Sequence, residues 1–95
     1  MKFEWDEKKQ KINIQKHGVD FEEAKTVFYD EEALLMPDPD HSATEERFVI
    51  LGISKKTNLL TVCHCYRENE EVIRIINARK ATAKEKKQYV ARKGK

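Results

Sequence analysis

The segment 72–82 constrains the fold of this chain most, because it predicts a buried strand that carries two arginines. Its sequence is VIRIINARKAT, and the β-branched and aliphatic residues in it are typical of a strand. Arg74 and Arg79 interrupt the apolar run, and arginine is seldom buried without a partner. Either acidic side chains therefore satisfy the two guanidinium groups, or these groups face a site that binds anions.

Length and composition favour one small domain over residues 1–95. Hydrophobic residues make up 39% of the chain and charged residues 38%, so we expect a small core and a highly charged surface. No run approaches the roughly 20 apolar residues that a transmembrane helix needs. The N-terminal residues lack the apolar stretch of a secretory signal peptide. We therefore expect a cytoplasmic protein that does not contact a membrane.

Three capping signals, at Asp6, at Asp20 with Glu23 and at Thr82 with Glu85, combine with hydrophobic spacing to predict three helices, two before the strands and one after them. The pattern between them alternates as strands do, and short polar turns separate its apolar runs. Consecutive strands with short turns favour an antiparallel meander, so we predict an α+β fold of order ααββββα with the helices on one face of a four-stranded antiparallel sheet. The expected helices cover about 7–17, 21–29 and 82–92, and the expected strands cover 33–36, 47–53, 59–67 and 72–79.

The C-terminal segment 80–95 carries the excess of positive over negative charge in this chain. It holds seven basic residues and one acidic residue, a net charge of +6, whereas residues 30–66 have a net charge of −4. A basic segment of this kind binds nucleic acid or an acidic partner, although a solvated surface helix has the same composition.

Four arginines are expected near strand ends, where their forked guanidinium groups suit a phosphodiester backbone. The alternative is that neighbouring glutamates satisfy these arginines. In that case Arg47 pairs with Glu45 or Glu46, and Arg74 pairs with Glu70 or Glu71. Strict alternation along the last strand places Arg74 and Arg79 on opposite faces, which makes Arg79 the stronger phosphate candidate. The four residues are Arg47, Arg67, Arg74 and Arg79.

His17 and Lys16 form a second candidate site, at the end of the first predicted helix. Histidine is the side chain that titrates near neutral pH without help, so it suits general acid–base chemistry. The alternative interpretation is structural, because cations in the last helical turn are favoured by the helix dipole and Gly18 is a usual helix stop.

Two further sets of residues raise the question of a metal. On a strand, Cys63 and Cys65 share one face while His64 points to the other, so we expect reduced thiols rather than a zinc site. The irregular segment 37–46 is acidic, and a metal-dependent nuclease using Asp38, Asp40 and Glu45 is one alternative function.

Two sequence patterns carry a resemblance to a known family. The pattern F-x-W-D-x-x-K-x-x-x-N-x-x-K-H-G-V-x-F-x-x-A begins at Phe3. The pattern R-I-I-N-A-R-K-A-T-x-x-E-x-x-x-Y begins at Arg74, with Glu46-Arg47 and Gly52 between the two. Together they resemble the BrnT family of toxins from type II toxin–antitoxin pairs over nearly the whole chain. Asn77 departs from the resemblance, which implies a serine at that position.

The resemblance implies a RelE-like fold and a ribonuclease that slows growth and uses neither metal nor cofactor. It also implies a BrnA-like antitoxin as partner, with a toxin dimer inside a toxin–antitoxin heterotetramer as one form of the complex. An alternative is a non-catalytic antitoxin-binding module that acts in operon repression. RNA cleavage by 2′-hydroxyl attack needs a base, an acid and cations on phosphate. The catalytic candidates are His17, Glu46, Arg47, Arg79 and Tyr89, and the RNA-binding candidates are Lys16, Arg67, Arg74 and Lys80.

Overall fold

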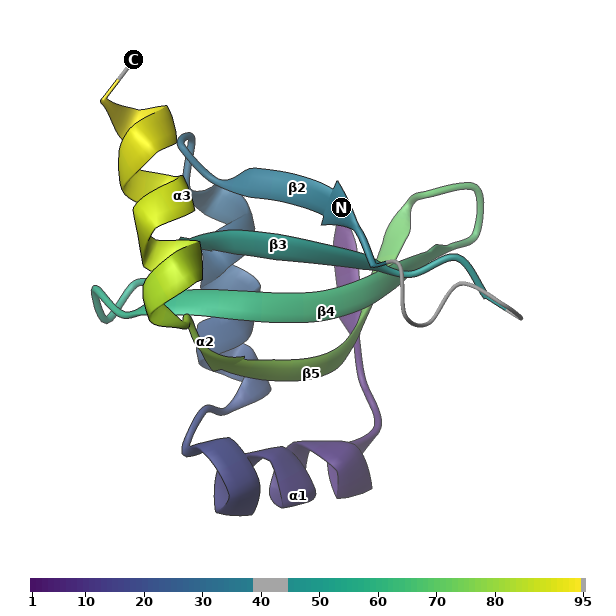
Figure 1. Cartoon of the computed structure of the whole chain (residues 1–95). Helices are drawn as coiled ribbons and strands as arrows, with labels where there is room; N and C mark the ends of the chain where they lie inside the picture. The colour runs from purple at the N-terminus through teal and green to yellow at the C-terminus, as the bar shows by residue number, and fades with distance from the viewer. Residues whose placement is uncertain (39–44, 95) are drawn as a thin grey trace.

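The computed structural model describes residues 1–38 and 45–94, and it shows an α+β arrangement of helices around a curved sheet (Figure 1). The predicted helices and strands are present with small shifts at their ends. In order along the chain, the elements are β1 Lys2–Glu4, α1 Glu7–His17, α2 Phe21–Thr26, the 3₁₀ turn η1 Val27–Tyr29, β2 Leu34–Pro37, β3 Phe48–Ile53, β4 Leu59–Arg67, β5 Val72–Lys80 and α3 Ala83–Lys93.

The sheet differs from the predicted four-stranded antiparallel meander. In the described residues it has five strands in the order β1-β5-β4-β3-β2, and β1 pairs in parallel with β5. The extra strand is short, and Phe3 lies opposite Ile73 in its register. Three residues are too few to show a period of two, so the sequence pattern did not reveal this strand.

One face of the sheet packs on α2 and η1 and forms the main core. Phe21, Ala24 and Val27 recur at helical spacing and are fully buried against Leu60 and Val62 of β4. Asp20 caps α2 by accepting a hydrogen bond from the Glu23 backbone N–H at 2.7 Å. The apolar stripe and the cap thus form α2 as the sequence predicted.

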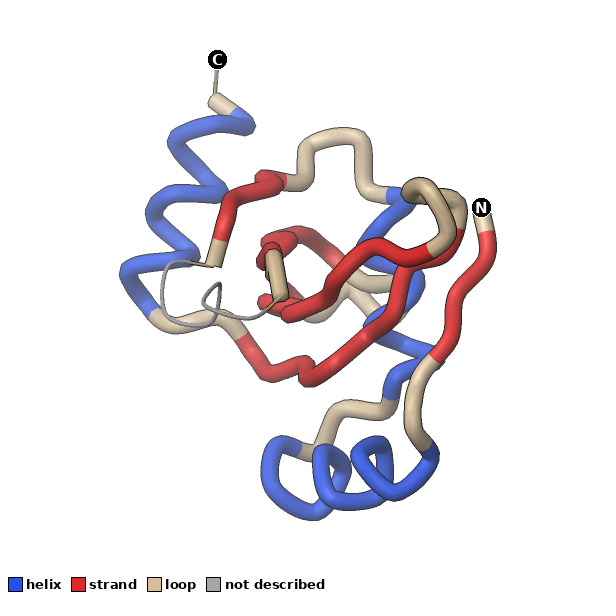
Figure 2. The backbone as a smooth tube through the Cα atoms, turned by 90° about the vertical axis from the view of Figure 1, so that its right-hand side faces the viewer, coloured by secondary structure: helices blue, strands red, loops and turns tan. Residues whose placement is uncertain are grey.

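The helices do not share one face of the sheet, contrary to expectation. Viewed along the sheet, α3 lies on one side and α2 on the other (Figure 2). The Tyr89 hydroxyl of α3 donates a hydrogen bond of 2.7 Å to Asp30, and Glu85 accepts one of 3.0 Å from Thr61 on β4. These polar contacts lie outside the main core. Because α3 is held by hydrogen bonds and not by an apolar stripe, its hydrophobic pattern does not show on which face of the sheet it lies.

Helix α1 covers the edge of β5 beyond the end of β1. The buried Asn13 side chain donates hydrogen bonds of 2.8 Å to the carbonyls of Val19 and Ala78, and it accepts one of 3.1 Å from the Ala78 N–H. Its amide therefore pairs with Ala78 as a neighbouring strand would. None of the helices in the described ranges is long and apolar enough to cross a membrane.

An irregularity in the β4–β5 ladder changes which side chains of β5 share a face. Cys63 lies opposite Asn77 and His64 lies opposite Ile75, which leaves Ile76 as the extra residue of a β-bulge. The bulge breaks strict alternation between Arg74 and Arg79. Arg74 pairs with Cys65 and Arg79 pairs with Thr61, and these two partners point to the same side of β4. The prediction of opposite faces is therefore wrong.

Candidate functional site

Helix α1 and the end of β5 together line a shallow depression of about 380 Å³. It brings together basic and polar side chains from two segments that lie more than fifty residues apart in the chain. Both Lys16 and His17 line it, as does Arg79, so the structure joins three of the sequence-predicted candidates. The lining residues are Lys9, Ile12, Asn13, Lys16, His17, Ile76, Asn77 and Arg79.

Arg79 is held in place from the side of α3. Its two terminal nitrogens donate hydrogen bonds of 2.8 and 3.0 Å to the two carboxylate oxygens of Glu85. Glu85 also accepts hydrogen bonds from the Thr61 hydroxyl and the Thr82 N–H. The bond from Arg79 lowers the pKa of Glu85 to about 2 and raises that of Arg79. A planar, permanently charged group is thus fixed in orientation while its side chain stays 38% exposed.

Lys16 and His17 occupy the exposed last turn of α1. Gly18 ends the helix in the left-handed region, with φ of 69°, and its N–H donates to the Ile14 carbonyl at 2.8 Å. Their positions agree with both interpretations of the sequence, because they lie at the negative end of the helix dipole and also line the depression.

The other three predicted arginines form a second group at the opposite end of the same face. Glu45 accepts hydrogen bonds from Arg47 at 3.4 Å and from Arg67 at 2.9 Å. Glu4 accepts one from Arg74 at 2.7 Å and lies 3.9 Å from Arg67. We call this set, Arg47, Arg67 and Arg74 with Glu4 and Glu45, the arginine cluster. It has one positive charge in excess.

The alternative partners expected for these arginines are confirmed in one case. Arg47 does pair with Glu45, whereas Arg74 pairs with Glu4 and not with Glu70 or Glu71. Glu4 belongs to β1, the strand that the sequence pattern did not reveal. The Glu4–Arg74 pair depends on the pairing of β1 with β5, so it could not be predicted either.

The bulge places Arg74 of the arginine cluster and Arg79 on one face of β5. Arg74 and Arg79 are five residues apart, which corresponds to about 15 Å along a strand. Asn77 lies between them on the same face and is exposed. The face therefore offers two cationic positions with a polar residue between them. Their separation suits two phosphates of an extended nucleic acid that are not adjacent better than it suits a single small anion.

The remaining candidates lie apart from the depression. Glu46 is exposed just before β3, next in sequence to the arginine cluster, and Lys80 is exposed at the end of β5. Tyr89 is 4% exposed and its hydroxyl donates a hydrogen bond to Asp30. Burial, together with this bond, raises the pKa of Tyr89 to about 12. This geometry gives Tyr89 a role in anchoring α3.

The described residues contain no group of three His, Cys, Asp or Glu side chains arranged to hold a metal ion. Glu45 is engaged by two arginines, and the Cys63 thiol lies 3.6 Å from the Asp38 carboxylate. Asp40, the third residue of the metal-dependent alternative, lies outside the described residues. Cys63 and Cys65 are free and buried, and burial raises the pKa of Cys63 to about 11.

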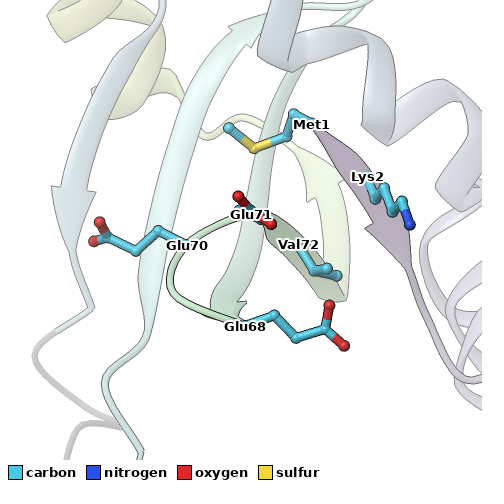
Figure 3. Close-up of a pocket in the computed structure, with 6 residues that line it drawn as sticks. All are labelled: Met1, Lys2, Glu68, Glu70, Glu71 and Val72. Carbon is cyan, nitrogen blue, oxygen red and sulfur yellow. The ribbon is translucent and has the colours of Figure 1, made fainter.

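A second hollow lies at the β4–β5 turn and contains none of the candidates. Glu68, Glu70 and Glu71 line it with Met1 and Lys2. Figure 3 shows the carboxylates of Glu68 and Glu70 pointing in different directions and away from a common centre. The side chains therefore do not converge on a ligand.

Sequence reasoning missed the residues that orient the site. Glu85 was expected only as part of a capping box, yet the same carboxylate holds Arg79. Asn13 was seen only as one position of a longer pattern. The sequence signal for the role of Asn13 is its polarity on the helix face that packs against a strand, because a buried polar side chain needs hydrogen-bond partners inside the protein.

Comparison with known proteins identifies the family of this chain. Residues 5–85 match a family model described as the ribonuclease toxin, BrnT, of type II toxin–antitoxin systems. The crystal structure of the Brucella abortus ribonuclease toxin BrnT is similar, with a TM-score of 0.67 and 27% sequence identity over 86% of this chain and 97% of that chain. No curated protein sequence gives a match.

The fold and the matched model together define a toxin of the type II toxin–antitoxin class. More narrowly, the chain belongs to the BrnT family, a family of ribonuclease toxins. The expected resemblance is thereby confirmed.

Proposed function

We propose that this chain is an endoribonuclease that cuts RNA without a metal ion, by RelE-like attack of a 2′-hydroxyl on the adjacent phosphate. The observation that carries the proposal is the depression where Lys16, His17 and the Glu85-oriented Arg79 meet. Family membership supports the ribonuclease class. The position of the cations supports this particular site.

The reaction requires a base, an acid and cationic stabilisation of the phosphate. His17 takes the proton from the 2′-hydroxyl, whose oxygen then bonds to phosphorus. The bond from phosphorus to the 5′-oxygen breaks, and Lys16 gives that oxygen a proton. The products are a 2′,3′-cyclic phosphate and a 5′-hydroxyl end, so atoms and charge balance without a cofactor.

Arg79 stabilises the charge that develops on the phosphate oxygens. Its bond to Glu85 fixes the guanidinium plane before substrate arrives, so little reorganisation is needed in the transition state. A guanidinium group already paired with a carboxylate keeps free N–H donors, because arginine has five.

The arginine cluster binds RNA beside the scissile phosphate. Arg67 and Arg74 are paired with glutamates in the free protein, and a phosphate exchanges with those carboxylates on binding. Glu46 is next to Arg47 of this cluster in the sequence and does not line the depression, whereas His17 does. We therefore assign the role of base to His17.

In the cell, RNA cleavage by this toxin would lower translation and growth in the cytoplasm, and an antitoxin of the BrnA type would neutralise it. The type II family supports the antitoxin partner.

The decisive experiment incubates purified protein with single-stranded RNA, with and without ribosomes, in the presence of a metal chelator. We expect cleavage to products with 2′,3′-cyclic phosphate ends. Replacing His17 with Gln or Arg79 with Ala should slow cleavage about a hundredfold or more. The matched control is Arg92→Ala, which removes an exposed arginine of α3 that does not line the depression.

Three outcomes would contradict parts of the proposal. Loss of activity with chelator would indicate a metal-dependent nuclease. Equal activity of Arg79→Ala and Arg92→Ala would place the site elsewhere. RNA left intact by the unmodified protein, with no growth arrest on induced expression, would favour the non-catalytic antitoxin-binding module.

A further inference from the structure

A groove of about 370 Å³ lies between α3 and the turn that joins β3 to β4, away from the depression that holds Arg79. Its apolar lining includes Ile53, Leu59 and Val90, and Val90 is 57% exposed. An aliphatic side chain this exposed, beside two half-buried ones, forms an apolar strip of the kind that marks an interaction site.

The rim of the groove is positively charged. Lys86 and Lys93 line it, and no acidic residue does so among the described residues that surround it. The acidic residue nearest in the α3 sequence, Glu85, is occupied by Arg79, Thr61 and the helix cap. A ligand that fits an aliphatic floor and a lysine rim is both apolar and acidic.

The chemistry of the groove suits a peptide better than RNA. Single-stranded RNA is held by exposed aromatic rings on which its bases stack, together with cations on its phosphates. The aromatic residue in this groove, Tyr89, is 4% exposed and its hydroxyl is bonded to Asp30. The aliphatic side chains of Ile53, Leu59 and Val90 offer no stacking platform.

We propose that an acidic segment of the antitoxin, carrying at least one aliphatic side chain, docks in this groove. The inference rests on the antitoxin partner of the proposed function and adds the surface and the chemistry of the contact. The aliphatic side chain packs beside Val90, and carboxylates pair with Lys86 and Lys93.

The groove is formed before the partner arrives, because α3 is anchored at two points. Tyr89 bonds to Asp30 and Glu85 bonds to Arg79, so the helix is tied to both β5 and the segment before β2. A preformed groove reduces the ordering cost of binding. Glu85 of α3 also holds Arg79. A partner bound to α3 therefore contacts the helix that orients the proposed catalytic arginine.

The test measures the affinity of the full-length toxin for its co-encoded antitoxin by titration calorimetry, with two matched double variants. Lys86→Glu with Lys93→Glu reverses the charge of the groove. Lys84→Glu with Lys87→Glu makes the same change in net charge at exposed positions of α3 that do not line the groove. We expect the groove variant to bind about tenfold or more weakly and the control to bind within about twofold of the unmodified toxin.

A third variant, Val90→Asp, tests the apolar part of the groove and should also weaken binding, because it places a carboxylate in the strip. Thermal unfolding of each variant checks that α3 remains folded. Equal losses in the two double variants would overturn the proposal, since net charge alone would then explain them. Loss of RNA affinity without loss of antitoxin affinity would also overturn it and assign the groove to RNA.

These outcomes are independent of catalysis. If the unmodified toxin cuts no RNA, the proposed function fails, yet the difference in antitoxin affinity between the two double variants still decides whether the groove is a docking site.

Discussion

His64 is a fully buried histidine enclosed by aromatic rings. The centroid of its ring lies 4.8 Å from that of Phe28, 5.2 Å from that of Tyr66 and 6.2 Å from that of Phe48. Its ring nitrogens lie 3.2 Å from the Val62 carbonyl and 3.3 Å from the Tyr66 hydroxyl. Burial lowers the pKa of His64 to about 4, so the residue is neutral in the folded protein at neutral pH.

This burial predicts a loss of stability in mild acid. The unfolded chain binds a proton at His64 below about pH 6.5 and the folded chain only near pH 4, so stability falls as pH decreases through this window. We expect the free energy of unfolding to be about 2 kcal/mol lower at about pH 5 than at about pH 7.5. Urea unfolding at the two pH values measures the difference.

The control is His64→Phe, which keeps an aromatic ring but does not titrate. It should lose most of this pH dependence, whatever its own stability. Glu85 does not interfere, because its pKa of about 2 means that its contribution is lost only at lower pH. A His64→Phe protein with the full loss at pH 5 would show that other groups are responsible.

Asn13 is the second residue whose burial has a measurable consequence. Replacing it with Ala removes three hydrogen bonds and leaves the polar groups of Val19 and Ala78 buried without partners. We expect the free energy of unfolding to fall by about 3 kcal/mol. Chemical denaturation measures this, and Gln15→Ala, at an exposed position of the same helix, should change it by no more than about 0.5 kcal/mol. Equal effects of the two changes would contradict this role for Asn13.

At the scale of elements, the β3–β4 turn contains a strained residue. Thr57 has a φ of 64°, a left-handed conformation that is unfavourable for a β-branched side chain. Its N–H donates a hydrogen bond of 2.8 Å to the Ser54 carbonyl, which closes the turn. The turn and the strands around it therefore hold Thr57 in a conformation that glycine adopts freely.

Thr57→Gly should stabilise the protein by about 1 kcal/mol, because glycine relieves the left-handed strain. Thr57→Ala is the control, since alanine removes the hydroxyl and the branch but keeps the Cβ that causes most of the strain. Differential scanning calorimetry should show a higher melting temperature for the glycine variant than for the alanine variant. The opposite order would argue against backbone strain at this turn.

Also at this scale, the sequence predicted which elements form better than how they assemble. The caps at Asp6, Asp20 and Thr82 predicted the helix starts, because capping is a local interaction. The bulge at Ile76 was not predictable, because one extra residue changes no composition and little periodicity. The bulge nevertheless moves each β5 side chain after Ile76 to the face opposite the one that strict alternation from Arg74 predicts.

For the molecule as a whole, Arg79 and the arginine cluster lie on one face but in different surroundings. Arg79 lines the depression with His17, whereas Arg74 is tied to Glu4 about 15 Å further along the strand. If both contact RNA, we expect different kinetic signatures from Arg79 and Arg74, because one acts on the reacting phosphate and the other on a neighbouring one.

Arg74→Ala should raise the KM for RNA about fivefold, equivalent to about 1 kcal/mol, and leave kcat nearly unchanged. It should also reduce the dependence of RNA affinity on salt by about one phosphate contact. Arg79→Ala should instead lower kcat. Steady-state kinetics at several salt concentrations separates these effects, and a fall in kcat for Arg74→Ala equal to that for Arg79→Ala would contradict the division.

The sequence by itself determined the class of this protein, its helices and most of its strands, and the cations from which a site is built. These depend on local caps, short-range periodicity and a residue pattern that all lie within contiguous stretches. Only the tertiary structure decided that His17 and Arg79 share a depression, that Arg74 and Arg79 share a face, and that their acidic partners are Glu4 and Glu85 respectively. Those relations depend on strand register and on a bulge, which arise from contacts between residues distant in sequence.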